Sequence, residues 1–356
     1  MRRGGKLSFA AGLVALSMLA AACGGNDEAG GGGSSEAGGG GSSEDLSNLT
    51  GEVFISGSST VEPISSLVAE LFSEEAPNVE ITVEGPGTGD GFELFCNGES
   101  DVSDASRPIE EEEIAACEEN GIQYTELEVA LDGISVLTNP DNSAVTCLNT
   151  ADLYALTGPE SEGFSNWSDA NQLGEEIGGI GVPYPDTDLS ITAPGEESGT
   201  FDAYIELAGF EDIGVERGLS EDEAATTRPD YQSSSNDNVI IDGIAGSPSS
   251  FGWVGFSFYE QNQDVVKAIE ISSEDESGCV APSFESIADG SYPLSRSLYI
   301  YVNNAKAADS DALSAYVDFY MSETGLQTAV EEVSYVTLPD DRIEATRQTW
   351  EDAQAA

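Results

Sequence analysis

The chain has 356 residues, 39% of them hydrophobic, and a formal net charge of −56 that arises from 67 acidic and 11 basic residues. Its length and hydrophobic content suffice for two domains with buried cores. So acidic a surface should repel nucleic acid and anionic lipid headgroups, and it should repel a dianionic ligand unless the chain has a site built for one. Histidine is absent, which excludes Ser–His–Asp and Cys–His catalysis and histidine-ligated zinc.

The N-terminal 22 residues have the pattern of a secretory signal. Basic residues within the first six positions precede an apolar run over 7–22 that is short for a membrane span. The run leads to Leu19-Ala-Ala-Ala-Cys23, which resembles a bacterial lipoprotein box and implies a lipid on Cys23; an ordinary cleavage site beside an incidental cysteine is the alternative. Residues 23–48 are rich in glycine, serine and acids, a composition that predicts a flexible tether.

The folded part opens with a predicted strand, helix and strand. Glu52-Val-Phe-Ile-Ser56 is a short apolar strand, the helix ends near Glu75, and Val79–Glu84 alternates like a half-buried strand. Between the first strand and the helix lies Gly57-Ser-Ser-Thr-Val-Glu-Pro-Ile64, with hydroxyl residues and a proline where a helix N-terminus needs them. This is a hydroxyl-rich turn that can face a ligand; a well-capped helix without a ligand is the alternative.

A glycine-rich turn, Gly85-Pro-Gly-Thr-Gly-Asp-Gly91, opens a second short helix that continues to Cys96. Glycine lets backbone N–H groups approach a ligand, and a helix N-terminus adds unpaired donors and a positive dipole end. Arg107, one of few cations in the chain, follows a short strand and precedes Pro108. Hydroxyls, N–H groups and one arginine suit a small tetrahedral oxyanion.

The rest of the chain alternates helices and strands. We expect helices or helical turns over 110–120, 147–156, 164–169, 202–207, 236–245, 309–321, 323–332 and 340–353, and strands over 124–139, 179–192, 251–257 and 292–302. The strands at 124–139 and 292–302 are long enough to cross between lobes. Ser198-Gly-Thr200 is a third hydroxyl-glycine turn at a helix start. If two α/β lobes face each other, the three turns converge on one anion.

Five cysteines in an exported chain leave four once Cys23 carries a lipid, and four allow three pairings. We prefer Cys96 with Cys117 and Cys147 with Cys279, because each bridge then stays inside one lobe. No cysteine pair has the CxxC spacing of a metal or redox site, so we expect no metal and no cofactor.

Residues 51–353 resemble the phosphate-binding proteins of high-affinity phosphate ABC transporters. The matching segments are Gly57-Ser-Ser-Thr-Val-Glu-Pro-Ile64, Gly87-Thr-Gly-Asp-Gly-Phe92, Asp104-Ala-Ser-Arg-Pro-Ile109, Ser198-Gly-Thr-Phe201, Tyr292-Pro-Leu-Ser-Arg296 and Tyr299-Ile-Tyr-Val-Asn303. The resemblance implies a type II periplasmic-binding-protein fold, with two α/β lobes joined by two crossover strands and the ligand in the cleft. Lobe 1 would comprise 49–131 and 297–356, and lobe 2 would comprise 132–296.

The turns and the resemblance together give a set of expected ligand-binding residues: Ser59, Thr60, Val61, Thr88, Gly89, Asp90, Ser106, Arg107, Ser198, Gly199 and Thr200. Two charged positions of the family pattern differ, because Ser106 replaces an aspartate that accepts the ligand's proton and Pro194 replaces an arginine. We expect Arg107 to supply the cation, unless it pairs with an acid such as Asp104 or Glu110. Asp90, with Asp104 behind it, is the expected proton acceptor.

The sequence thus predicts a lipid-anchored, monomeric solute-binding protein on the outer face of the cytoplasmic membrane. It would capture inorganic phosphate, deliver it to the permease of an ABC transporter and catalyse no reaction. The alternatives are a binder of another oxyanion such as sulfate or molybdate, a secreted phosphoryl or ester hydrolase, and a surface protein that has lost its ligand. The acidity is explained most simply by adaptation to a salty medium, where screening is strong; an acid-specific partner is the other explanation.

Overall fold

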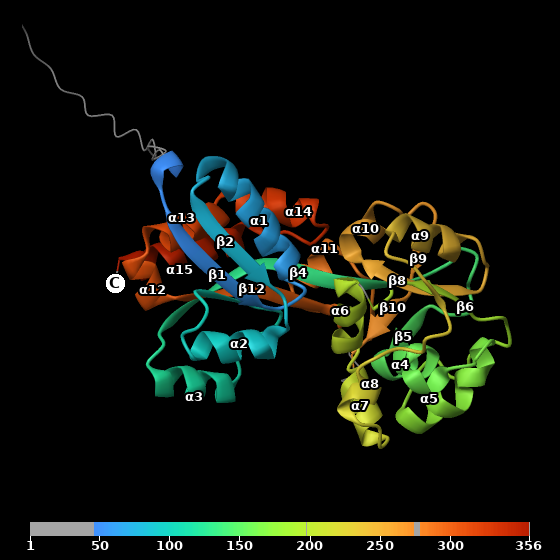
Figure 1. Cartoon of the computed structure of the whole chain (residues 1–356). Coiled ribbons are helices and arrows are strands. Elements are labelled where there is room, and N and C mark those ends of the chain that lie inside the picture. Colours follow the sequence, from blue (N-terminus) through green and yellow to red (C-terminus); the bar gives the residue numbers. More distant parts are fainter. Residues whose placement is uncertain (1–45, 197, 274–277, 356) are drawn as a thin grey trace, which may run out of the picture. The chain divides into compact units, whose positions relative to one another are not determined.

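The computed structural model describes residues 46–196, 198–273 and 278–355, and the chain from Asp45 onward forms one unit (Figure 1). The predicted signal, Cys23 and the tether up to residue 45 lie outside the described residues. The last predicted tether residues form a 3-10 turn, η1 (Leu46–Asn48), and the Asn78 side chain donates a hydrogen bond to the Ser47 carbonyl. Among the described residues, no helix is both long and apolar enough to cross a membrane.

A mixed nine-stranded sheet runs through the folded unit in the order β2-β1-β3-β12-β4-β8-β6-β7, with β9 beside β4. Its strands are β1 (Gly51–Gly57), β2 (Val79–Glu84), β3 (Val102–Ala105), β4 (Tyr124–Thr138), β6 (Ser190–Ala193), β7 (Gln232–Ser233), β8 (Ser250–Gly255), β9 (Lys267–Ala268) and β12 (Ser295–Asn303). A second sheet has the order β11-β10-β5 and consists of β5 (Cys147–Asn149), β10 (Glu270–Ser272) and β11 (Cys279–Val280).

The long strand β4 joins two groups of elements. Up to Gly133 it pairs antiparallel with β12, and from Ile134 to Leu137 it pairs antiparallel with β8. β12 in turn pairs with β3, so β12 and the first part of β4 complete the β2-β1-β3 half of the sheet. We call this half with its helices lobe 1 and the β8-β6-β7 half with its helices lobe 2. The lobe boundaries expected at 131/132 and 296/297 lie close to the position where β4 changes its partner strand, and they remain predictions.

Helices flank the sheet, as expected for an α/β fold, and Figure 1 labels them and colours them along the sequence. They are α1 (Glu62–Glu75), α2 (Thr88–Cys96), α3 (Glu111–Asn120), α4 (Thr150–Thr157), α5 (Asn171–Ile177), α6 (Gly199–Leu207), α7 (Phe210–Glu216), α8 (Glu221–Ala224), α9 (Asp237–Ala245), α10 (Phe256–Glu260), α11 (Phe284–Ala288), α12 (Asn304–Asp309), α13 (Asp311–Tyr320), α14 (Val330–Glu332) and α15 (Asp340–Gln354). The remaining helical segments are the 3-10 turns η2 (Pro159–Ser161) and η3 (Trp167–Ala170) and the π-helix η4 (Thr324–Ala329).

The helix that follows the first hydroxyl turn is fixed by a regular apolar stripe. Ile64, Val68 and Phe72 recur every four residues on α1 and are fully buried. The Phe72 ring packs against Tyr316 and Phe319 of α13, with ring centroids 5.8 and 5.5 Å apart. This packing holds α1, and therefore the turn that begins it, against the sheet of lobe 1.

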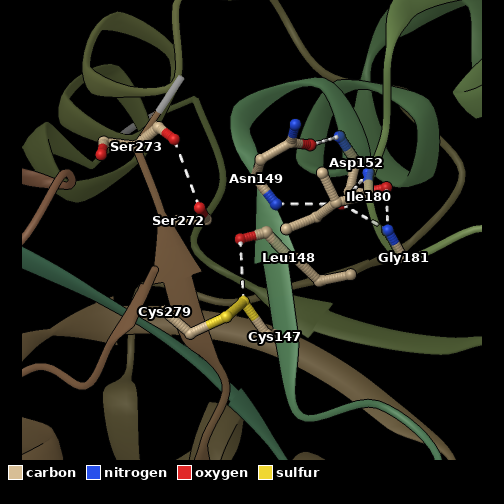
Figure 2. Close-up of a disulfide and its surroundings, with 9 residues drawn as sticks. All are labelled: Cys147, Leu148, Asn149, Asp152, Ile180, Gly181, Ser272, Ser273 and Cys279. Atoms are coloured by element: carbon tan, nitrogen blue, oxygen red, sulfur yellow. Dashed lines mark hydrogen bonds between the residues drawn. A yellow bond between two sulfur atoms is a disulfide. The ribbon is translucent and has the colours of Figure 1, made fainter. Parts of the chain in front are cut away.

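The strand-rich segment expected over 179–192 is wrong for most of its length, because only β6 at its end is extended. A buried carboxylate replaces strand pairing there: Asp152 accepts hydrogen bonds from the backbone N–H groups of Ile180 and Gly181 (Figure 2). It also accepts one from the Tyr184 hydroxyl. Prolines at 183 and 185 also lack the N–H that a strand ladder needs. The segment is therefore a loop tied to the start of α4.

Both preferred disulfides are present in the structure. Cys96 pairs with Cys117, which joins α2 to α3 in lobe 1. Cys147 pairs with Cys279, which joins β5 to β11 across the small sheet, and Figure 2 shows this bridge beside Asp152. The first bridge lies within lobe 1, and the second lies within the small sheet.

Candidate functional site

The first hydroxyl turn is held rigidly at the carboxyl end of β1. Ser58 donates its N–H to the Asp104 carbonyl at 2.8 Å, and its hydroxyl oxygen accepts the Thr60 N–H at 3.1 Å. The Val61 N–H, expected to face a ligand, donates to the Ser58 carbonyl at 3.1 Å. The turn therefore offers the hydroxyls of Ser59 and Thr60, whereas the Thr60 and Val61 N–H groups have partners inside it.

The second turn packs on the first because two glycines meet. A Cβ placed at Gly91 would lie 2.4 Å from the Cα of Gly57, so α2 approaches the end of β1 more closely than any side chain allows. The Gly87 N–H donates to the Gly57 carbonyl at 2.9 Å. No side chain caps the start of α2, which leaves the first-turn N–H groups of Thr88, Gly89 and Asp90 facing outward from the helix end.

A pair of hydroxyls joins this turn to the end of β3. Thr88 Oγ1 and Ser106 Oγ lie 3.0 Å apart, and the Ser106 N–H donates to Thr88 Oγ1 at 3.2 Å. Ser106 is only 4% exposed. The two residues, 18 positions apart in the sequence, thus lie side by side, and their contact with a ligand stays a prediction.

The third turn, in lobe 2, reaches the first turn in lobe 1. Ser198 caps α6 by accepting the Thr200 N–H at 3.2 Å, and Gly199 is the first helical residue. A Cβ placed at Gly199 would lie 3.8 Å from the Ser59 carbonyl oxygen and 4.0 Å from the Tyr335 hydroxyl. Burial raises the pKa of Asp202, on the same helix, while a hydrogen bond with the Ser59 side chain lowers it. The start of α6 therefore lies against the first turn, while convergence of the three turns on one anion stays a prediction.

Arg107 lies beside these turns but has acidic partners. Its Nη1 and Nη2 donate to the two carboxylate oxygens of Glu113 at 2.9 and 2.8 Å, and its Nε lies 3.2 Å from Glu110. The guanidinium also lies 5.7 Å from the Phe92 ring centroid. Pairing with Glu110 was the stated alternative to a ligand contact, and Glu113, which also completes a capping box at the start of α3, was not among the expected partners. A ligand contact by Arg107 stays a prediction and would have to displace these pairs.

The two proposed proton acceptors lie in different surroundings. Asp90 is exposed in the first turn of α2. Asp104 is fully buried, and its Oδ1 accepts the Ser65 hydroxyl at 2.9 Å. Burial raises the pKa of the Asp104 carboxyl to about 7, although the Ser65 hydrogen bond lowers it, and the charge of Glu62 raises it further. Asp90 is therefore the acceptor that solvent reaches.

The raised pKa of Asp104 predicts a pH dependence of stability. Between about pH 4 and pH 7, Asp104 is protonated in the native state and ionised in the unfolded chain, because its folded pKa is about 7. The contribution of this group to the free energy of unfolding therefore falls as the pH rises through that window. Relative to Asp104→Asn, the wild-type free energy of unfolding should fall by about 1.4 kcal/mol per pH unit in that window. Urea denaturation at pH 5, 6, 7 and 8 in concentrated salt measures it; parallel curves for the two proteins would contradict it.

A buried cation that the sequence analysis did not select for the site borders the first turn. Arg296, in β12, donates from Nη2 to Thr60 Oγ1 at 3.1 Å, and its Nε lies 3.4 Å from Asp132 Oδ2. Its Nη1 lies 2.5 Å from Glu206 Oε2 of α6. The available signal was a lone cation in a strand predicted to cross between lobes. Without contacts, the sequence did not show which way that side chain points.

The two lobes share one sheet, and hydroxyl-glycine turns from both lobes meet between them. This architecture is that of a two-lobed solute-binding protein. The chain belongs to the PBP superfamily: the model described as "PBP superfamily domain" matches residues 34–324. The predicted family and the α/β fold are thus confirmed.

Relatives and solved structures agree with this family. Protein SphX of Synechocystis sp. is 36% identical over 297 residues, which cover 83% of this chain and 81% of that protein. Phosphate-binding protein PstS of Staphylococcus haemolyticus is 33% identical over 325 residues, 91% of this chain and 90% of that protein. A crystal structure described as a possible phosphate binding protein from Planctomyces limnophilus matches with a TM-score of 0.76 and 35% identity, and covers 86% of this chain and 99% of its own.

Proposed function

We propose that this protein captures inorganic phosphate outside the cytoplasmic membrane and delivers it to the permease of an ABC transporter, without catalysing a reaction. The observation that carries the proposal is the contact between the start of α6 and the Ser59–Thr60 turn, beside the buried Arg296. Relatives that align over most of this chain bear the name phosphate-binding protein, which supports phosphate as the ligand.

The donors at this contact suit a tetrahedral oxyanion. The hydroxyls of Ser59 and Thr60 come from lobe 1, and the Gly199 N–H comes from the N-terminus of α6 in lobe 2. The Thr88–Ser106 pair adds hydroxyls from the neighbouring turn. An anion that binds both lobes would stabilise their closed arrangement, and opening about the crossover strands would release it to a permease.

Selectivity for phosphate over sulfate requires an acceptor for the proton that phosphate carries at neutral pH. Asp90 remains our proposed acceptor because it is exposed at the start of α2. The contact of Asp202 with Ser59 makes that carboxylate the second candidate. If either assignment holds, Asp90→Asn or Asp202→Asn relaxes the preference for phosphate; unchanged selectivity in both variants rejects both assignments.

Calorimetric titration of the full chain with phosphate and with sulfate tests the proposal. We expect one phosphate to bind per chain and sulfate to bind at least tenfold more weakly, in buffer with enough salt to screen the chain's negative charge. Equal or tighter binding of sulfate would assign the site to another oxyanion. Absence of binding by both ions would overturn the transport function.

Anchoring at Cys23 is part of the proposal and concerns residues outside the described structure. The lipoprotein-type sequence before Cys23 and the Gly/Ser-rich residues after it support a lipid anchor with a tether. The Cys23→Ala protein should leave the membrane fraction and appear in the medium. Its retention on the membrane would contradict the anchor.

A further inference from the structure

The side chain of Arg296 is held in one orientation at the contact between the lobes. It is 9% exposed, its Nη2 donates to Thr60 Oγ1, and its Nε faces the buried Asp132, which is 5% exposed. These two contacts come from lobe 1 and from the crossover strand β4. They hold the guanidinium beside the hydroxyl turn and leave its third nitrogen, Nη1, directed elsewhere.

That third nitrogen faces the half-exposed carboxylate of Glu206. Nη1 is buried and pairs with Glu206, whose Oε2 lies 2.5 Å away. The Glu206 side chain is 52% exposed, so water can solvate its carboxylate after a rotation. Arg296 thus has one enclosed counter-charge, Asp132, and one that can leave.

The start of α6 lies close to the same group. The Tyr335 hydroxyl lies 4.0 Å from the Cβ position of Gly199. Burial raises the pKa of Tyr335, Asp132 raises it further, and Arg296 lowers it. The Tyr335 phenol therefore lies near the Arg296–Asp132 pair and near the start of α6. Because Nη2 donates to Thr60 Oγ1, an anion bound by Thr60 would lie beside the Arg296 guanidinium.

We propose that Arg296 is the cationic ligand of the bound oxyanion, and that Glu206 competes with this anion for Arg296 Nη1. The inference rests on the proposed function and names the cation of the same site. Arg107 is the weaker candidate because Glu113 engages both of its Nη groups. Arg296, Asp132 and Glu206 together carry a charge of −1, so a phosphate cannot join them without strong repulsion unless Glu206 turns away.

Removing the competing charge gives the most direct test. Glu206 is half exposed, so Glu206→Gln should fold normally. We expect it to bind phosphate at least fivefold more tightly than the wild type, and we expect the gain to shrink in concentrated salt because screening weakens the repulsion that it relieves. Unchanged or weaker phosphate binding by Glu206→Gln would overturn the competition.

Removing the cation gives the second test. The double variant Arg296→Gln/Asp132→Asn deletes the guanidinium without leaving Asp132 buried and unpaired. Its matched control, Arg107→Gln/Glu113→Gln, removes the other arginine with its partner. We expect the first to lose at least tenfold in phosphate affinity and the control to lose less than twofold. The reverse order would assign the cation to Arg107.

Titrating each variant with both phosphate and sulfate distinguishes a failure of the proposed function from a failure of the proposed role of Arg296. Sulfate binding that equals phosphate binding and still depends on Arg296 would overturn phosphate as the ligand and retain the cation. Selective phosphate binding that is indifferent to both Arg296 and Glu206 would retain the function and overturn the cation. No oxyanion binding by any variant would overturn both.

Discussion

Gly199→Pro is expected to weaken phosphate binding by about 10- to 100-fold while leaving the fold intact. Proline lacks the backbone N–H, and losing one hydrogen bond to a charged acceptor costs about 1.5–3 kcal/mol. Proline is tolerated at the first position of a helix, where its fixed φ is already helical. Ser198, which precedes it, has φ −115° and ψ 128°, a conformation that the residue before a proline prefers.

The matched control is Gly199→Ala, which keeps the N–H. A Cβ at this position meets nothing closer than the Ser59 carbonyl oxygen at 3.8 Å, so the alanine variant should bind phosphate within about twofold of the wild type. Calorimetry of the two variants isolates one backbone donor, and their melting temperatures report the fold. Equal phosphate affinities in both would show that the start of α6 does not donate to the ligand.

Gly91→Ala is expected to destabilise the protein by about 1–3 kcal/mol, the usual cost of an overpacked site. The new Cβ would lie 2.4 Å from the Cα of Gly57 and 2.9 Å from the Ser56 carbonyl oxygen. Both neighbours are backbone atoms that cannot rotate aside, so α2 has to shift away from β1. This shift would also carry Thr88 away from the first turn and weaken phosphate binding.

Gly89→Ala, two residues earlier on the same helix, supplies the comparison. A Cβ there meets nothing within 4 Å, and replacing glycine by alanine within a helix stabilises it by about 0.5–1 kcal/mol. Guanidinium denaturation should therefore move the two variants in opposite directions from the wild type. Similar midpoints for both would show that the contact between α2 and β1 does not limit how closely the turns approach.

Local patterns were sufficient to predict most of the fold. The period-two alternation of Val79–Glu84 gave β2 at its observed bounds, and the apolar spacing from Ile64 to Phe72 gave α1. The long β-prone run from Tyr124 became β4, which changes partner where a crossing was expected. In each of these segments, the residues that the hydrophobic period marks as inward-facing favour the same secondary structure as the tertiary packing does.

The prediction failed where a long-range contact overrides local propensity. Residues 179–189 have strand-like stretches, yet Asp152, 28 residues before Ile180, takes the N–H groups that a neighbouring strand would have used. The small strand β5 was assigned to a helix because it forms by pairing with β10, a segment more than 120 residues later in the chain. Strands of three residues carry too few positions for a period to be recognised.

The turns were predicted from the sequence, whereas the partners of the charged side chains were not. Turn chemistry alone placed hydroxyls and glycines at three helix starts, and these starts lie together in the structure. The fate of Arg107 depended on Glu113, six residues away along a helix whose orientation the sequence does not specify. The contact of Arg296 with Thr60 spans 236 positions, a separation at which sequence pattern indicates no partner.

A crystal structure of the full chain grown with phosphate, at a concentration that saturates the calorimetric titration, tests the central claim most directly. We expect the anion between the Ser59–Thr60 turn and the start of α6, within hydrogen-bond distance of the Gly199 nitrogen and of Arg296 Nη1, with Glu206 turned away. Phosphate bound elsewhere on the molecule, with the Glu206–Arg296 pair intact, would contradict both the site and its cation.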